Sequence, residues 1–106
     1  MTLERTIETR IRRICEDLGC VAVKFSQPGV MGAPDRLILC PGGAAMFLEV
    51  KRPGESPSPH QLAYMGRLRA MGFRVRWTDR PHNVKAWIEN AIQGRDIPAG
   101  GDPLYL

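Results

Sequence analysis

Asp35 and the pair Glu49 and Lys51 are the residues whose types and positions most clearly suggest chemistry. Asp35 precedes the apolar run 36–40, and Glu49 and Lys51 end a second apolar run, 45–51. Side chains two apart on a strand leave the same face, so Glu49 and Lys51 are neighbours. Alone, Glu-x-Lys would be a surface ion pair and Asp35 a turn residue. The apolar runs argue against this, because such runs are typical of strands covered on both faces.

A hairpin would bring the two acids together. The Pro-Gly-Gly-Ala segment 41–44 predicts such a turn between the runs. If it is centred on its glycines, cross-strand partners have numbers that sum to about 85, and opposed Cα atoms are roughly 4.5–5.5 Å apart. Asp35 then lies opposite the segment 49–51. Two carboxylates this close repel each other, and a divalent cation removes the repulsion. Their oxygens suit Mg²⁺ or Mn²⁺, with the Val50 carbonyl as a further candidate ligand.

The elements that must position these residues alternate in the order α-β-β-β-α-β-α. Apolar residues at helical spacing predict helices over about 3–18, 60–71 and 84–92. Runs of apolar and alternating residues predict strands over 20–25, 36–40, 45–51 and 73–77. This order predicts an α/β fold with a mixed central sheet flanked by helices.

Length and composition indicate one basic domain. The chain has 106 residues, of which 43% are hydrophobic and 25% charged, and its formal net charge is +4. We expect residues 1–94 to form the domain and the Gly- and Pro-rich residues 95–106 to form a tail. The positive charge favours a polyanionic partner, although charge alone is equally compatible with a domain that is merely basic.

Other kinds of site find little support. The three cysteines contain no Cys-x-x-Cys pair, which disfavours a disulfide framework and a zinc site; Cys15 and Cys40 are expected to be core residues. His60 and His82 lack a paired nucleophile at a recognisable spacing, and no Gly-x-x-x-x-Gly-Lys segment occurs. Without a signal peptide or an apolar run of about 18 residues, we expect a cytoplasmic protein with no membrane partner.

The segments GAPDRLIL, FLEVKRPG and SPHQ, in this order, resemble the VRR-NUC family of the PD-(D/E)XK nuclease superfamily. That family includes stand-alone phage and bacterial proteins and the nuclease domain of the Fanconi-associated nuclease. The resemblance extends from about Glu4 to Ile92, and the ordered set of segments is more specific than any one of them. It implies a restriction-endonuclease-like core and an Mg²⁺- or Mn²⁺-dependent deoxyribonuclease that hydrolyses phosphodiester bonds.

The resemblance also implies roles for individual residues. Asp35 and Glu49 resemble the acidic metal ligands of the family's active site. Lys51 resembles the lysine that orients the attacking water or stabilises charge on the phosphate. Gln61 resembles the glutamine that braces the site or a substrate phosphate, although by itself it would be an exposed residue in the first turn of a helix.

The first helix offers two candidates for a third catalytic and metal-binding carboxylate. Glu4 and Glu8 lie on one flank of its apolar stripe, about one turn apart, so either could reach the end of the sheet. The spacing from Glu8 to Gly19 resembles that of archaeal Holliday-junction resolvases. This favours Glu8 and keeps Glu4 as the alternative. Either acid could instead be a solvated residue near the N-terminus of the helix, where the helix dipole favours negative charge.

Basic residues near the expected site are candidates for DNA binding: Lys24, Arg36, Arg52 and Arg67. Arg52 follows Lys51, and Lys24 lies at the end of the first expected strand. Arg10, Arg12 and Arg13 point away from the apolar stripe of the first helix. They could bind phosphate or solvate the helix, and we expect solvation for most of them. Contacts to phosphates through such residues would be salt-dependent and largely independent of base sequence.

These features favour a metal-dependent, structure-specific DNA endonuclease that resolves four-way (Holliday) junctions. Related junction resolvases are dimeric, and a homodimer would present two active sites to one branched substrate. A flap-type or other DNA nuclease of the same superfamily is an alternative, as is a basic DNA-binding module without catalysis. The intact set of Asp35, Glu49 and Lys51 favours the enzyme, because a binding module needs none of these residues.

Overall fold

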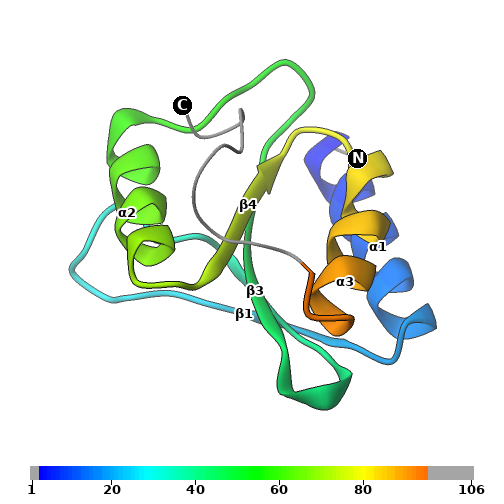
Figure 1. Ribbon diagram of the computed structural model, residues 1–106. Helices are drawn as coiled ribbons and strands as arrows, with labels where there is room; N and C mark the ends of the chain where they lie inside the picture. The colour runs from blue at the N-terminus through cyan, green and yellow to red at the C-terminus, as the bar shows by residue number, and fades with distance from the viewer. Residues whose placement is uncertain (1–2, 96–106) are drawn as a thin grey trace.

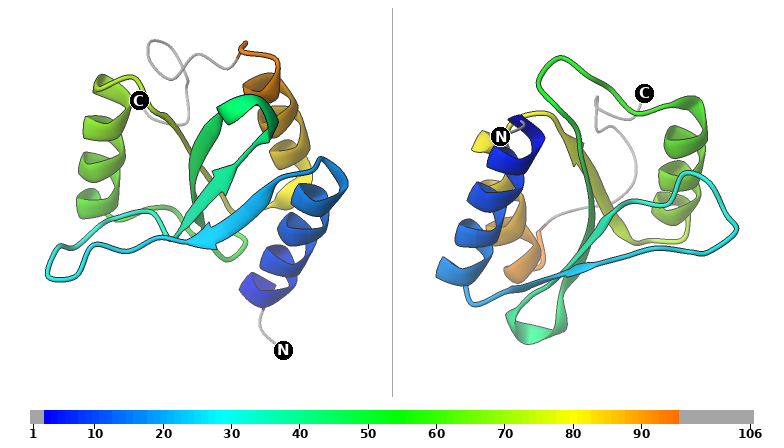
Figure 2. Two further views of the ribbon diagram at one scale, coloured as in Figure 1. Left: turned by 90° about the horizontal axis from the view of Figure 1, so that it is seen from below. Right: turned by 180° about the vertical axis from the view of Figure 1, so that it is seen from behind.

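The computed structural model describes residues 3–95, with side chains described from Arg5 onward. A four-stranded sheet lies between α1 and α3 on one face and α2 on the other (Figure 1, Figure 2). The elements are α1 (Leu3–Asp17), β1 (Val21–Lys24), β2 (Arg36–Leu39), η1 (Pro41–Gly43), β3 (Ala45–Val50), α2 (Pro59–Ala70), β4 (Arg74–Thr78), η2 (Pro81–Asn83) and α3 (Val84–Ile92). This order confirms the predicted α/β fold. The tail predicted for residues 95–106 lies outside the described residues, apart from Arg95.

The sheet has the strand order β1-β2-β3-β4 and is mixed. The β1–β2 and β2–β3 pairs are antiparallel, whereas β3 and β4 are parallel and connected through α2. In the β2–β3 hairpin, Arg36 lies opposite Leu48 and Leu39 lies opposite Ala45. This register continues to Asp35 opposite Glu49, within the segment that the sequence predicts.

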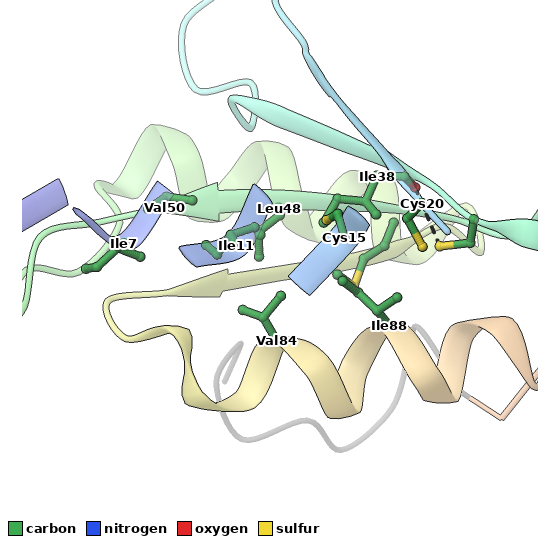
Figure 3. Packing of buried hydrophobic residues seen from close by; sticks show 11 residues of the cluster. Ile7, Ile11, Cys15, Cys20, Ile38, Leu48, Val50, Val84 and Ile88 are labelled. Atoms are coloured by element: carbon green, nitrogen blue, oxygen red, sulfur yellow. Dashed lines mark hydrogen bonds between the residues drawn. The ribbon is translucent and has the colours of Figure 1, made fainter. Parts of the chain in front are cut away.

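The alternation of side chains along the strands divides the core into two halves. Residues of β2 and β3 that face α1 and α3 include Ile38, Leu48 and Val50, which are almost fully buried. Figure 3 shows these side chains meeting residues of both helices, among them Ile7, Ile11, Val84 and Ile88. The opposite face packs Phe47 and Val75 against Tyr64, Met65 and Leu68 of α2. Glu49, two residues after Phe47, belongs to this second face.

The segment between β1 and β2 is held against the start of α2. The hydroxyl of Tyr64 donates a hydrogen bond of 2.7 Å to the side-chain oxygen of Gln27. Gly32 has a φ of 97°, and a Cβ atom there would lie 2.5 Å from the carbonyl oxygen of His60. Only glycine permits this approach. The loop that leads into Asp35 is therefore fixed relative to α2.

Cys15 and Cys40 are core residues, as the sequence predicts. Cys15, Cys20 and Cys40 are all buried and none forms a disulfide. Burial raises the pKa of Cys15 to about 11 and that of Cys40 to about 12. These thiols are thus core residues rather than reactive nucleophiles. Within residues 3–95, no helix has the length and hydrophobicity needed to span a lipid bilayer.

Candidate functional site

Glu49 is a buried carboxylate near the end of the central strand β3. Only 5% of the residue is exposed, because β2 and β4 flank it and α2 covers its face of the sheet. Nε2 of Gln61 donates a hydrogen bond of 3.1 Å to its Oε2, and Nζ of Lys51 lies 3.4 Å from the same oxygen. The sequence prediction that Glu49, Lys51 and Gln61 share one location agrees with this geometry.

The electrostatics of Glu49 follow from its burial and from a second acid. Burial raises the pKa of Glu49 from its ordinary value of 4.5 to about 7, and the charge of Asp35 adds to the increase. Lys51 and a backbone hydrogen bond from Asp35 oppose the shift but do not cancel it. A carboxyl that resists ionisation beside another carboxylate is typical of a site that binds a cation or transfers protons.

Asp35 is held at the site by its own backbone. Its carbonyl oxygen accepts a hydrogen bond of 3.0 Å from the amide of Phe25 and another of 3.0 Å from Nη1 of Arg36. These bonds fix the chain immediately before β2, where the hairpin register brings Asp35 to Glu49. The hairpin register therefore brings the two acids together, and the charge of Asp35 contributes to the raised pKa of Glu49.

Gln61 is oriented by the N-terminus of α2. Ser58 caps this helix: its Oγ accepts a hydrogen bond of 3.2 Å from the amide of Gln61, and its amide donates one of 2.8 Å to Oε1 of Gln61. This reciprocal arrangement is a capping box. Because Oε1 is occupied by Ser58, the side-chain amide presents its nitrogen to Glu49. Gln61 is therefore an ordered component of the site and not merely a solvated residue of the first turn.

Glu8, the favoured third carboxylate, lies on the other face of the sheet. Its Oε1 is 2.6 Å from Nη2 of Arg36, which shares that face with Leu48 and Val50. Among the side chains that the structure describes, no three His, Cys, Asp or Glu residues are arranged to hold one metal ion. The structure thus brings Asp35 and Glu49 together but leaves Glu8 apart from them, and a metal-binding role for Glu8 stays a prediction. The side chain of Glu4 lies outside the described residues.

The four basic residues expected to bind DNA do not form one cluster. Lys24 and Arg36 line a common hollow beside α1. Arg52 is exposed and its Nε lies 3.2 Å from the carboxylate of Glu55. The guanidinium of Arg67 lies 5.4 Å from the centre of the Tyr64 ring. Of these four residues, only Lys24 and Arg36 line the same hollow.

Two residues, Arg12 beside the hollow and Ser58 beside Gln61, are not among the site residues predicted from the sequence. Arg12 does more than solvate the helix, because it lines the same hollow as Lys24 and Arg36. The signal for its position is its spacing of four residues from Glu8, which places both on one helix face. Ser58 has a signal as well, because Ser-x-x-Gln is the pattern of a capping box.

The chemistry of the donor groups fits a hard divalent cation. Asp35 and Glu49 offer carboxylate oxygens, and neutralising their mutual repulsion would favour ionised Glu49. The side chain of Val50 packs into the core on the opposite face, so only its backbone carbonyl remains as a candidate ligand. Mg²⁺ and Mn²⁺ prefer oxygen ligands of these kinds.

The chain is similar to a phage protein in sequence and to a solved domain in structure. No family model matches the chain. A protein named "Putative nuclease p44", from Acyrthosiphon pisum secondary endosymbiont phage 1, is 42% identical over 74 residues, which are 70% of this chain and 75% of that protein. A solved structure described as "VRR_NUC domain" is similar with a TM-score of 0.77 and 34% identity, covering 84% of this chain and 97% of that one.

Proposed function

Because the chain belongs to the VRR-NUC family, we propose that it is a metal-dependent DNA endonuclease that hydrolyses phosphodiester bonds in branched DNA. The observation that carries this proposal is the meeting of Asp35, Glu49, Lys51 and Gln61 at one end of the sheet. Two carboxylates, the ammonium group of Lys51 and the side-chain amide of Gln61 can together act on a phosphate. A DNA-binding module without catalysis needs no buried carboxylate.

Asp35 and Glu49 are the residues that would hold Mg²⁺ or Mn²⁺, with the Val50 carbonyl as a further ligand. When bound, the cation would supply positive charge opposite the phosphodiester and make water more acidic. Glu8 is retained as a third ligand in the proposal, although it contacts Arg36 in this structure.

Lys51 and Gln61 have distinct tasks in this proposal. The Lys51 side chain is 21% exposed, so its ammonium can approach a phosphate oxygen while remaining close to Glu49. It would orient the attacking water or stabilise charge on the phosphate. Gln61 orients Glu49 through Nε2, and its own orientation is set by Ser58 through Oε1. A pre-organised carboxylate avoids reorganisation when the substrate binds.

We further propose that the substrate is a four-way junction and that the enzyme acts as a homodimer. Two paired cuts require two active sites, which a two-fold dimer provides. Exposed apolar side chains near the α2–β4 turn favour an interface there: Met71 is 67% exposed and Phe73 49% exposed. Tyr64 of α2 is buried against the sheet and is unsuited to an interface.

A panel of labelled substrates tests this function. The purified protein would be incubated with a four-way junction, a flap, a splayed arm and a plain duplex, with Mg²⁺, Mn²⁺ or excess chelator. We expect paired nicks in the junction with either metal and none with chelator. Cleavage of flaps with intact junctions would support the flap-type alternative, and binding without cleavage of any substrate would support the non-catalytic module. A monomer mass by light scattering would contradict the proposed dimer.

A further inference from the structure

A small hollow lies between α1 and the sheet, on the face opposite Glu49. Its volume is about 80 Å³. Its polar lining comes from three elements: Glu8 and Arg12 of α1, Lys24 of β1 and Arg36 of β2. Apolar residues, including Val50, complete it. The strand register explains the grouping, because Lys24 lies opposite Arg36 and the pair therefore shares one face.

The hollow carries an excess of positive charge. Arg36 is paired with Glu8 at 2.6 Å, so these two charges largely offset each other. Arg12 and Lys24 are exposed and take part in no ion pair with the side chains of residues 5–95. Two cations beside one hollow with partly apolar walls attract an anion more strongly than the same cations spread over an open surface, because the apolar walls focus their field.

The hollow adjoins the candidate active site. Arg36 follows Asp35 in the chain and donates a hydrogen bond of 3.0 Å to its carbonyl oxygen. Val50 lies between Glu49 and Lys51. Each carboxylate is thus followed in the chain by a residue that lines the hollow: Asp35 by Arg36, and Glu49 by Val50. The hollow and the carboxylates are neighbours along the strands but lie on opposite faces of the sheet.

We propose that this hollow binds an internal backbone phosphate of the DNA substrate, next to the phosphate that is cleaved. The inference rests on the proposed nuclease function and adds a second contact point to it. One DNA strand crosses the end of the sheet, with the scissile phosphate at Asp35 and Glu49 and a neighbouring phosphate at Arg12 and Lys24. While Arg36 is paired with Glu8, as in this structure, it lines the hollow without supplying a free charge. If Glu8 turned to a bound metal ion, Arg36 would add its charge to the hollow.

The matched pair Arg12 and Arg13 provides the test. Both are exposed residues of α1, but Arg12 lines the hollow and Arg13 does not. The Kd for a four-way junction would be measured by fluorescence anisotropy in chelator, over a range of salt concentrations. We expect Arg12→Ala to weaken binding about 10-fold and to reduce the slope of log K against log salt by about 1, as for loss of one phosphate contact. Arg13→Ala should change Kd less than about 2-fold.

A second measurement identifies the phosphate. Single neutral methylphosphonate linkages would be placed at successive positions around the wild-type cleavage site, which is mapped in Mg²⁺ or Mn²⁺. At one flanking position, the neutral linkage should weaken binding of the wild type and leave Arg12→Ala unaffected. Lys24→Ala should show the same coupling.

Equal effects of Arg12→Ala and Arg13→Ala, or the absence of a coupled position, would overturn the proposed phosphate site. Cleavage by the wild type would leave the nuclease function intact in that case. Conversely, if the wild type bound the junction but did not cut it, the methylphosphonates would be scanned around the branch point. A coupled position there would support the phosphate site although the nuclease function had failed.

Discussion

Gln61 Nε2 lies 3.1 Å from Glu49 Oε2, so the first turn of α2 is hydrogen-bonded directly to the end of β3. The same glutamine completes the capping box with Ser58. One residue therefore both starts a helix and orients a buried carboxylate. The position of the helix and the geometry of the candidate active site are linked through this side chain.

Mutations can separate the two roles of Gln61, which are to cap α2 and to orient Glu49. Gln61→Ala removes the contact with Glu49 and half of the capping box, whereas Ser58→Ala removes only the cap side chain. We expect each variant to lose about 1 kcal/mol of unfolding free energy. Cleavage should fall about 10-fold or more in Gln61→Ala only, because that change alone leaves Glu49 free to reorient. Equal cleavage by the two variants in initial-rate assays would show that Gln61 acts only through the helix.

The acids and the lysine should matter more for catalysis than for folding. Asp35→Ala, Glu49→Ala and Lys51→Ala should each reduce cleavage by at least about 100-fold while retaining the fold and much of the DNA affinity. Glu55→Ala is the matched control, since this exposed acid pairs with Arg52 on the loop that follows β3. Wild-type rates for Glu49→Ala or Lys51→Ala would show that the site is assigned to the wrong residues.

Glu49 should make the metal-free protein sensitive to pH. Its pKa is raised from 4.5 to about 7 in the folded state, so the folded protein holds this proton more tightly than the unfolded chain. The resulting stability is present below pH 4.5 and is lost as the pH rises through 7. The loss is on the order of 3 kcal/mol.

Urea unfolding of the wild type and of Glu49→Gln at pH 4.5 and pH 8, in chelator, measures this effect. The glutamine cannot ionise, so its stability should decline less over this range. Mg²⁺ at pH 8 should restore stability to the wild type but not to Glu49→Gln. Parallel pH profiles of the two proteins would mean that Glu49 is not perturbed by burial.

The role of Glu8 can be distinguished by metal affinity. We expect Glu8→Gln to reduce cleavage more than Glu4→Gln does. If Glu8 ligates metal, calorimetric titration with Mn²⁺ should show weaker binding in Glu8→Gln. If it acts only through Arg36, metal affinity should be unchanged while cleavage falls, because the guanidinium that holds the Asp35 carbonyl has lost its partner. Full activity in Glu8→Gln with loss in Glu4→Gln would reverse the assignment.

Much of the site follows from rules that act over a few residues. The alternation of side chains along a strand places Glu49 and Lys51 on one face, and the glycines of η1 set a hairpin register that brings Asp35 to Glu49. The capping pattern at Ser58 and Gln61 is equally local. These features were accessible from sequence because strand period, turn geometry and helix capping depend on neighbouring residues.

Packing decided what local rules could not. The raised pKa of Glu49 requires α2 and two flanking strands to exclude water, and the Glu8–Arg36 pair depends on how α1 is rotated on the sheet. The hollow at Arg12 and Lys24 likewise joins elements distant in sequence. Sequence spacing determined which side chains share a strand or a helix face. The distances between elements came from the burial of both sheet faces, which only the whole fold specifies.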